Sequence, residues 1–189
     1  MAEDTMIIDE IVARARTAQA RYEAMGSQAL FDKACLAVAW VLMQPERNRA
    51  LAEMAVEETG LGNADDKVRK NHNKTLGLMR DIKDITAFGH VEDDNENGLS
   101  IYYRPKGVIA AVVPSTNPLA TPVNNTINAL KTGNAIILAP SPKGVKPLLA
   151  LFEHIHPALA KLGLPEDLVQ MAPAPPSKPK TERLMQLAD

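Results

Sequence analysis

The chain has 189 residues, of which 46% are hydrophobic and 23% are charged, and its net charge is −2. These values fit one globular domain or one compact part of a larger protein. The nearly neutral charge and the few aromatic residues (three Phe, three Tyr, one Trp) argue against nucleic acid as a partner. The single cysteine excludes an internal disulfide, so a reducing compartment, the cytoplasm, is expected.

The ends and the apolar runs of the sequence predict no membrane partner. The chain opens with acidic residues rather than a basic segment followed by an apolar one, so no signal peptide is expected. The longest apolar runs, Gly107–Pro114 and Ala135–Ala139, are far too short to cross a bilayer.

Apolar residues recur at three- and four-residue steps through the first 85 residues, which predicts a series of helices. The first helix ends at Gly26, and Ser27 can cap the second. Pro45 suits the first turn of a third helix that runs to Gly60. A fourth helix is expected from about Asp65 to Ile85. Its apolar side carries Val68, Thr75, Leu76, Met79 and Ile82, and the basic residues Lys67, Arg69, Lys70 and Lys74 lie around it.

The second half of the chain predicts alternating strands and helices. The acidic segment 92–98 should form a turn or loop, and Leu99–Tyr103 a strand. Two nearly all-apolar segments, 107–113 and 135–139, are typical of strands buried on both faces of a parallel sheet. Helices should follow them, the first starting at Thr121-Pro122 and ending at Gly133, the second running from Val145 to Leu162.

A third strand over Leu168–Met171 and a last helix from Thr181 complete the pattern. The fold class is therefore α/β, with amino-terminal helices followed by a partial doubly wound parallel sheet. A sheet of three parallel strands leaves an open edge, which suggests that a further segment belongs to it.

Two turns should lie at the ligand-binding edge of such a sheet, beyond the carboxyl ends of its strands. They are Pro114–Pro118 and Ala139–Gly144. Backbone N–H groups at the following helix starts, with Ser115, Thr116, Asn117, Ser141 and Lys143, can hold a phosphate or a developing oxyanion. Proline and serine are also ordinary turn residues, so the pattern leaves binding turns and plain connecting loops open.

Other candidate sites are weaker. The sequence contains neither GxxxxGK[ST] nor GxGxxG after a strand. Cys35 falls on the apolar face of the second helix, which favours burial over a role as nucleophile. His154 and His156 are two residues apart on a helix and point to different sides, and no cysteine or carboxylate cluster completes a site, so we expect no metal.

Two segments carry a family resemblance: PKGVIAAVVPSTNP (105–118) and NALKTGNAIILAPSPKG (128–144). They resemble the aldehyde dehydrogenase superfamily, and PSTNP in place of a PWNFP-type turn resembles its CoA-acylating branch. The resemblance implies a fold in which residues 1–90 are the helical part, and residues 98–189 a βαβαβα part, of an NAD(P)-binding domain. It also implies NAD or NADP as cofactor, CoA as co-substrate, a small aldehyde as substrate and a homo-oligomer built partly through Leu99–Tyr103.

The resemblance assigns roles to particular positions. The turn at Pro114–Pro118 would lie near the reacting carbonyl, with Thr116 or Asn117 as the oxyanion donor. The turn at Ala139–Gly144 matches one that contacts the adenosine ribose, although Ala139 replaces the usual lysine and leaves NAD or NADP open. The implied cofactor contacts are Val113, Pro114, Ser115, Pro140, Ser141, Lys143, Pro173 and Ala174.

In relatives of this kind a cysteine thiolate attacks the aldehyde, hydride passes to NAD(P)+, and CoA then releases the acyl group as acyl-CoA. That cysteine would lie well beyond the position that matches Asp189, in a catalytic domain absent from this chain, and Cys35 does not match its motif. The sequence thus predicts an inactive cofactor-binding fragment of an acylating aldehyde dehydrogenase. The alternative is a non-catalytic module that binds nucleotide or associates with itself.

Overall fold

The computed structural model describes residues 2–189, and their side chains from Thr5 onward. In chain order the elements are α1 (Ala2–Ala24), α2 (Gln28–Met43), α3 (Pro45–Thr59), α4 (Ala64–Ile82), β1 (Gly89–Asp94), β2 (Leu99–Tyr103), β3 (Val108–Val113), α5 (Ala120–Lys131), β4 (Ala135–Pro140), η1 (Pro142–Gly144), α6 (Val145–Ala160), η2 (Glu166–Leu168), β5 (Val169–Met171) and α7 (Lys178–Leu187).

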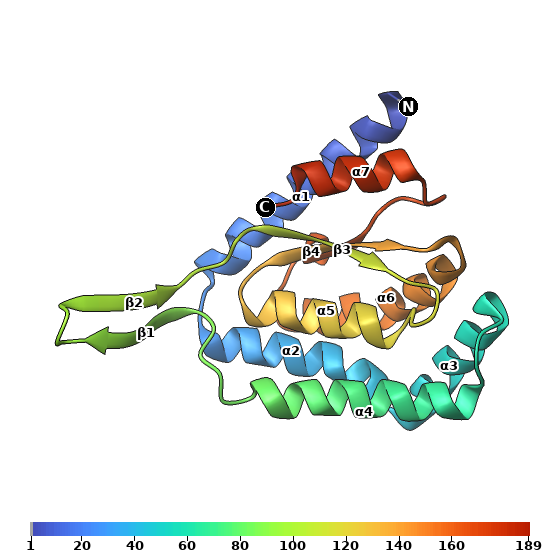
Figure 1. Cartoon of the computed structure of the whole chain (residues 1–189), viewed down its shortest axis with the longest axis horizontal. Helices are drawn as coiled ribbons and strands as arrows, with labels where there is room; N and C mark the ends of the chain where they lie inside the picture. The colour runs from blue at the N-terminus through green and yellow to red at the C-terminus, as the bar shows by residue number, and fades with distance from the viewer. Residues whose placement is uncertain (1) are drawn as a thin grey trace.

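The centre of the fold is a parallel sheet in the order β3-β4-β5. Val108 lies opposite Ala135, and Ile136 lies opposite Val169. Helices α5 and α6 cover one face with α2 packed against both, while α1 and α7 cover the other face (Figure 1). Every residue of β4 is buried, as expected for a strand with helices on both faces. The α/β class and the partial doubly wound sheet are confirmed.

The predicted boundaries hold for the start of α2 and for both ends of α3, and they are wrong for the starts of α5 and α7. The Ser27 hydroxyl accepts a hydrogen bond from the Leu30 N–H at the start of α2. Pro45 opens α3, and Gly60 closes it in the left-handed conformation. Thr121 is not the cap of α5, because that helix already begins at Ala120 behind Leu119. Likewise α7 begins at Lys178, capped by Ser177, rather than at Thr181.

The buried side of α4 differs in part from the predicted one. Its buried residues are Lys67, Asn71 and Thr75, whereas Leu76 is exposed. The reason is a polar contact with α3: the Asn71 amide donates to Asn48 Oδ1 (2.9 Å), and Asn48 donates to the Val68 carbonyl (3.0 Å). These hydrogen bonds turn Lys67 and Asn71 inward beside Thr75. The predicted side is therefore right at Thr75, Met79 and Ile82, which are buried or pack against the core, and wrong at Leu76.

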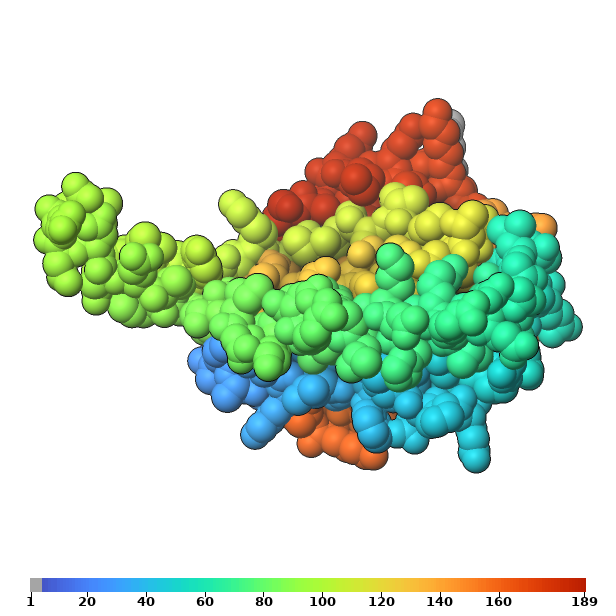
Figure 2. All heavy atoms as spheres, turned by 60° about the horizontal axis from the view of Figure 1, so that its bottom comes forward, coloured from blue at the N-terminus to red at the C-terminus, as the bar shows by residue number. Residues whose placement is uncertain are grey.

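In the acidic segment 92–98, expected to be a turn or loop, residues 95–98 make the turn as predicted. Residues 92–94 instead end the strand β1, which pairs antiparallel with β2. The hairpin projects from the body (Figures 1 and 2), so its acidic side chains stay in water. Asp93 also accepts a hydrogen bond from the Ser100 hydroxyl across the two strands (2.7 Å). Pairing with β2 decides this strand, and a local composition signal does not contain that information.

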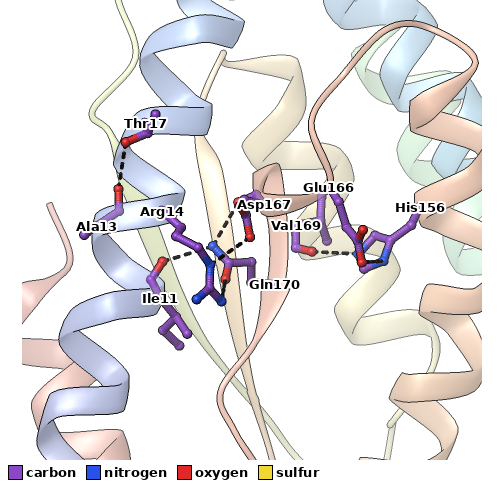
Figure 3. A network of polar contacts seen from close by, with 9 residues as sticks. All are labelled: Ile11, Ala13, Arg14, Thr17, His156, Glu166, Asp167, Val169 and Gln170. Atoms are coloured by element: carbon purple, nitrogen blue, oxygen red, sulfur yellow. Dashed lines mark hydrogen bonds and ion pairs between the residues drawn. The ribbon is translucent and has the colours of Figure 1, made fainter.

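The amino end of β5 is tied to the helices on both sides of the sheet (Figure 3). Arg14 of α1 pairs with Asp167 (3.2 Å), and the Gln170 amide donates to the Ile11 carbonyl (3.0 Å). On the other side, His156 Nε2 lies 2.8 Å from the Val169 carbonyl and its Nδ1 lies 3.1 Å from Glu166. None of the helices in the part of the chain that the structure describes is long and apolar enough to cross a membrane.

Candidate functional site

A cleft of about 510 Å³ opens at the carboxyl ends of β3 and β4. Its walls are the end of β3 with the turn that follows it, the end of β4 with its turn, and the beginning of α7. The lining residues are Val112, Val113, Pro114, Ser115, Ala139, Pro140, Ser141, Pro142, Pro176, Ser177, Lys178 and Thr181. This is the edge at which open α/β sheets bind ligands. The structure therefore brings the two predicted turns together in one cleft.

The turn after β3 is closed by the Asn117 N–H, which donates to the Pro114 carbonyl (3.4 Å). Thr116 is exposed and Asn117 is half-buried, and neither residue lines the cleft. The Thr116 carbonyl faces α4, where Lys70 Nζ lies 3.4 Å from it. The Thr116 carbonyl thus lies on the α4 side of the turn, and the roles of Thr116 and Asn117 as oxyanion donors stay predictions.

Ser141 connects the two turns and carries a buried hydroxyl at the wall of the cleft. Its N–H donates to the Val113 carbonyl (2.9 Å), which ties the two turns together. Its Oγ atom is buried, yet no hydrogen-bond partner reaches it from the described residues. Buried hydroxyls are normally satisfied, and buried polar atoms of Thr75, Asn124 and Thr126 also lack partners among the described residues, so Ser141 differs from these only by its place at the wall of the cleft.

Lys143 does not belong to this cleft. Its ammonium donates instead to the Thr59 carbonyl at the end of α3 (3.4 Å). Lys178, which sequence reasoning missed, lines the rim of the cleft, and its exposed ammonium lies 3.5 Å from the Glu182 carboxylate. It occupies the first position of α7, directly after the cap residue Ser177, and a correct placement of that helix start would have found both.

Pro173 and Ala174 lie in the loop before α7, but the lining residues of that loop begin at Pro176. The loop is held by the buried Lys180, whose ammonium donates to the Pro173 (3.2 Å) and Pro175 (3.0 Å) carbonyls. The other candidates of the sequence lie away from the cleft. Cys35 is buried, as predicted, and burial is the first cause that raises the pKa of its thiol to about 12.

The comparison with known families decides the identity. The Aldehyde dehydrogenase family matches residues 2–185. The chain belongs to the aldehyde dehydrogenase family. The cleft at Val113–Ser115 and Pro140–Ser141 is thus formed by the two segments that carry the resemblance.

Among characterised aldehyde dehydrogenases, the chain is similar to acylating members. It is 55% identical to "Sulfoacetaldehyde dehydrogenase (acylating)" of Cupriavidus necator over 179 residues. This matched segment covers 95% of this chain and 36% of that protein. It is 38% identical over 182 residues to "Succinate-semialdehyde dehydrogenase (acetylating)" of Clostridium kluyveri, which covers 96% of this chain and 39% of the relative. The chain thus spans well under half the length of these relatives.

Solved aldehyde dehydrogenases share the fold. An acetylating aldehyde dehydrogenase from Geobacillus thermoglucosidasius superposes with a TM-score of 0.91 at 30% identity, over 100% of this chain and 41% of that one. The propionaldehyde dehydrogenase of Rhodopseudomonas palustris with bound CoA superposes with a TM-score of 0.77 at 32% identity, over 94% of this chain and 39% of that one. An engineered glycolyl-CoA reductase with bound NADP+ superposes with a TM-score of 0.77 at 31% identity, over 94% of this chain and 39% of the reductase.

Proposed function

We propose that this chain supplies the NAD(P)-binding part of a CoA-acylating aldehyde dehydrogenase, an oxidoreductase that converts aldehyde, CoA and NAD(P)+ to acyl-CoA and NAD(P)H. The carrying observation is the cleft at the ends of β3 and β4, lined by the two family turns. The relatives named as acylating and the CoA- and NADP+-bound neighbours support the same reaction. Within this function, residues 1–90 form the helical part of the cofactor domain, and residues 98–189 form its βαβαβα part.

The residues of the cleft fit a nucleotide cofactor. The unsatisfied Ser141 Oγ can take a hydrogen bond from a ribose, and Lys178 can exchange its surface pairing with Glu182 (3.5 Å) for a phosphate. Val113, Pro114, Ser115 and Pro140 provide the apolar walls and backbone groups that orient it. When bound, the cofactor accepts hydride from the substrate, and the chain's own task is to hold it and exclude water.

The nucleophile of the proposed reaction lies outside this chain. Cys35 cannot serve, because it is buried beneath α5, where its Sγ lies 3.3 Å from the Ile127 carbonyl, and its thiolate form is disfavoured. Thr116 and Asn117 would act at the reacting carbonyl only with the part of the enzyme that carries the nucleophile. The isolated chain is therefore expected to bind cofactor without turnover.

We infer that the substrate is a small aldehyde with an anionic group at its other end. The two relatives described above are named for sulfoacetaldehyde and succinate semialdehyde, which carry a sulfonate and a carboxylate. A cytoplasmic location suits a chain with one buried, reduced cysteine.

Self-association is a second candidate function, favoured by the projecting hairpin. Leu99, Ile101, Tyr102 and Tyr103 are all exposed on β2, an unusual run of apolar surface for a strand. Pairing of this strand or its face with a second copy would bury them and give the proposed homo-oligomer.

Two measurements test the proposal. Calorimetric titration of the chain with NAD+, NADP+ and CoA should show binding of at least one of them. If none of the three binds, the chain has no cofactor role. Mixing the chain with aldehyde, CoA and NAD+ should produce no NADH absorbance. Turnover that disappears in Cys35→Ala would instead show that the chain is a complete enzyme.

A further inference from the structure

Lys67 is a buried cation for which the described residues provide no partner. Its exposed fraction is 5%, and no hydrogen bond or ion pair reaches its ammonium. The neighbouring carboxylates are already used, because Asp65 pairs with Arg49 (2.6 Å) and Asp66 pairs with Arg69. Burial, and secondarily the charge of Lys70, lower the pKa of Lys67. An arrangement of this kind is costly and persists in proteins chiefly where an anion compensates it.

Lys70 lies one helical turn after Lys67 and connects the pair to the turn after β3. Its Nζ donates to the Thr116 carbonyl at 3.4 Å, a long contact that leaves the other ammonium N–H groups for further partners. Helix α4 (teal to green in Figure 2) runs beside α5 (yellow), which follows this turn. Lys67 and Lys70 therefore lie next to the place where the proposed function puts the aldehyde.

The backbone that carries the two lysines is fixed against α3. The Asn71 amide donates to Asn48 Oδ1 (2.9 Å), and the Asn48 amide donates to the Val68 carbonyl (3.0 Å). On the other side, Cε of Lys67 lies 4.0 Å from the position of a Cβ on Gly62, so the side chain passes close under the loop before α4. Because this backbone is already fixed, anion binding has to order only the ends of the two side chains, which lowers its entropic cost.

We propose that Lys67 and Lys70 bind the anionic end, a sulfonate or carboxylate, of the substrate aldehyde. The inference rests on the proposed function, which places the carbonyl of the aldehyde at the turn Pro114–Pro118. The sulfonate or carboxylate supplies the negative charge that Lys67 lacks within the protein, and its several oxygens accept from both lysines at once. This site lies on the α4 side of the turn and is separate from the cofactor cleft, which contains neither lysine.

The test is a titration of the 189-residue chain with ethanesulfonate and with propionate, followed by amide chemical shifts in NMR spectra. Both anions should shift the resonances of residues 67, 70 and 116–117, and neutral ethanol should not. Lys67→Met and Lys70→Met should each weaken the binding about tenfold. Lys33→Met, which removes an exposed lysine from α2, is the matched control and should change it less than about twofold.

The spectra of the variants also show whether the chain stays folded. Removal of an unpaired buried charge should not unfold the chain, so Lys67→Met is expected to keep the wild-type spectrum elsewhere. The proposal is wrong if Lys67→Met binds the anions as the wild type does, or if the shifts appear at residues 141 and 178 instead. It is also wrong if only NADP+ or CoA shifts the resonances of residues 67 and 70, since their phosphates would then be the ligand. Anion binding without any NAD(P)+ or CoA binding would contradict the cofactor role alone.

Discussion

Asp189 and Val108 hold the end of α7 against the beginning of β3 through two reciprocal hydrogen bonds. The Val108 N–H donates to the Asp189 carboxylate (3.0 Å), and the Asp189 N–H donates to the Val108 carbonyl (3.0 Å). The same carboxylate pairs with Arg16 of α1 (3.1 Å). One side chain thus joins α7, the edge strand of the sheet and the helix that covers it.

This contact predicts a stability change that depends on pH. The Val108 N–H, and less strongly Arg16, lower the pKa of Asp189 although partial burial opposes them. A lowered folded-state pKa means that the stabilisation is present above the unfolded-state pKa and is lost as the pH falls through the folded-state value. Asp189→Asn should lower the free energy of unfolding in urea by about 1 kcal/mol at neutral pH, since the group is partly exposed. An equal difference in strong acid would contradict this origin.

Gly133 should tolerate a side chain far less well than Gly60. Both have positive φ, +75° and +67°, so Ala at either position costs about 1 kcal/mol in backbone strain. At Gly133 a Cβ would also lie 2.8 Å from the Phe31 ring and from Pro105, whereas nothing lies within 4 Å at Gly60. Gly133→Ala should therefore cost about 1–3 kcal/mol more than Gly60→Ala in chemical denaturation. Equal losses would show that Phe31 and Pro105 move aside.

The Cys35 thiol should be unreactive in the folded chain. Burial raises its pKa to about 12, and its Sγ contacts the Ile127 carbonyl in the core. A thiol-exchange reagent at neutral pH should therefore label Cys35 only after urea has unfolded the chain, which provides the control for full reaction. Rapid labelling under native conditions would mean that α2 and α5 separate readily.

Ser141→Ala should separate ligand binding from folding. Because Ser141 Oγ has no partner within the described protein, its loss should change the free energy of unfolding by less than about 0.5 kcal/mol. Nucleotide affinity, measured by calorimetry, should nevertheless fall about threefold to tenfold. Ser177→Ala is the contrasting variant: its hydroxyl caps α7 through the Lys180 N–H, so it should destabilise the chain by about 1 kcal/mol.

Local signals account for most of the fold that the sequence predicts. A cap at Ser27, a proline at Pro45 and a left-handed glycine at Gly60 act within one helical turn, so their neighbours in the sequence suffice. The same holds for the strand β4, because its unbroken run of apolar residues already predicts burial on both faces of the sheet. Prediction failed where partners are distant: the strand β1 forms because β2 pairs with it, and Asn71 of α4 is buried because Asn48 of α3 binds it.

The candidate site divides in the same way. The sequence by itself determined the two turns, because the proline and serine residues that end β3 and β4 are read from the chain directly. Only the tertiary structure decided where the lysines lie: Lys178 lines the cleft from α7, Lys143 turns away to Thr59, and Lys67 is buried with no partner among the described residues. Where a long charged side chain ends is set by the elements packed around it, and its own position in the sequence does not contain that information.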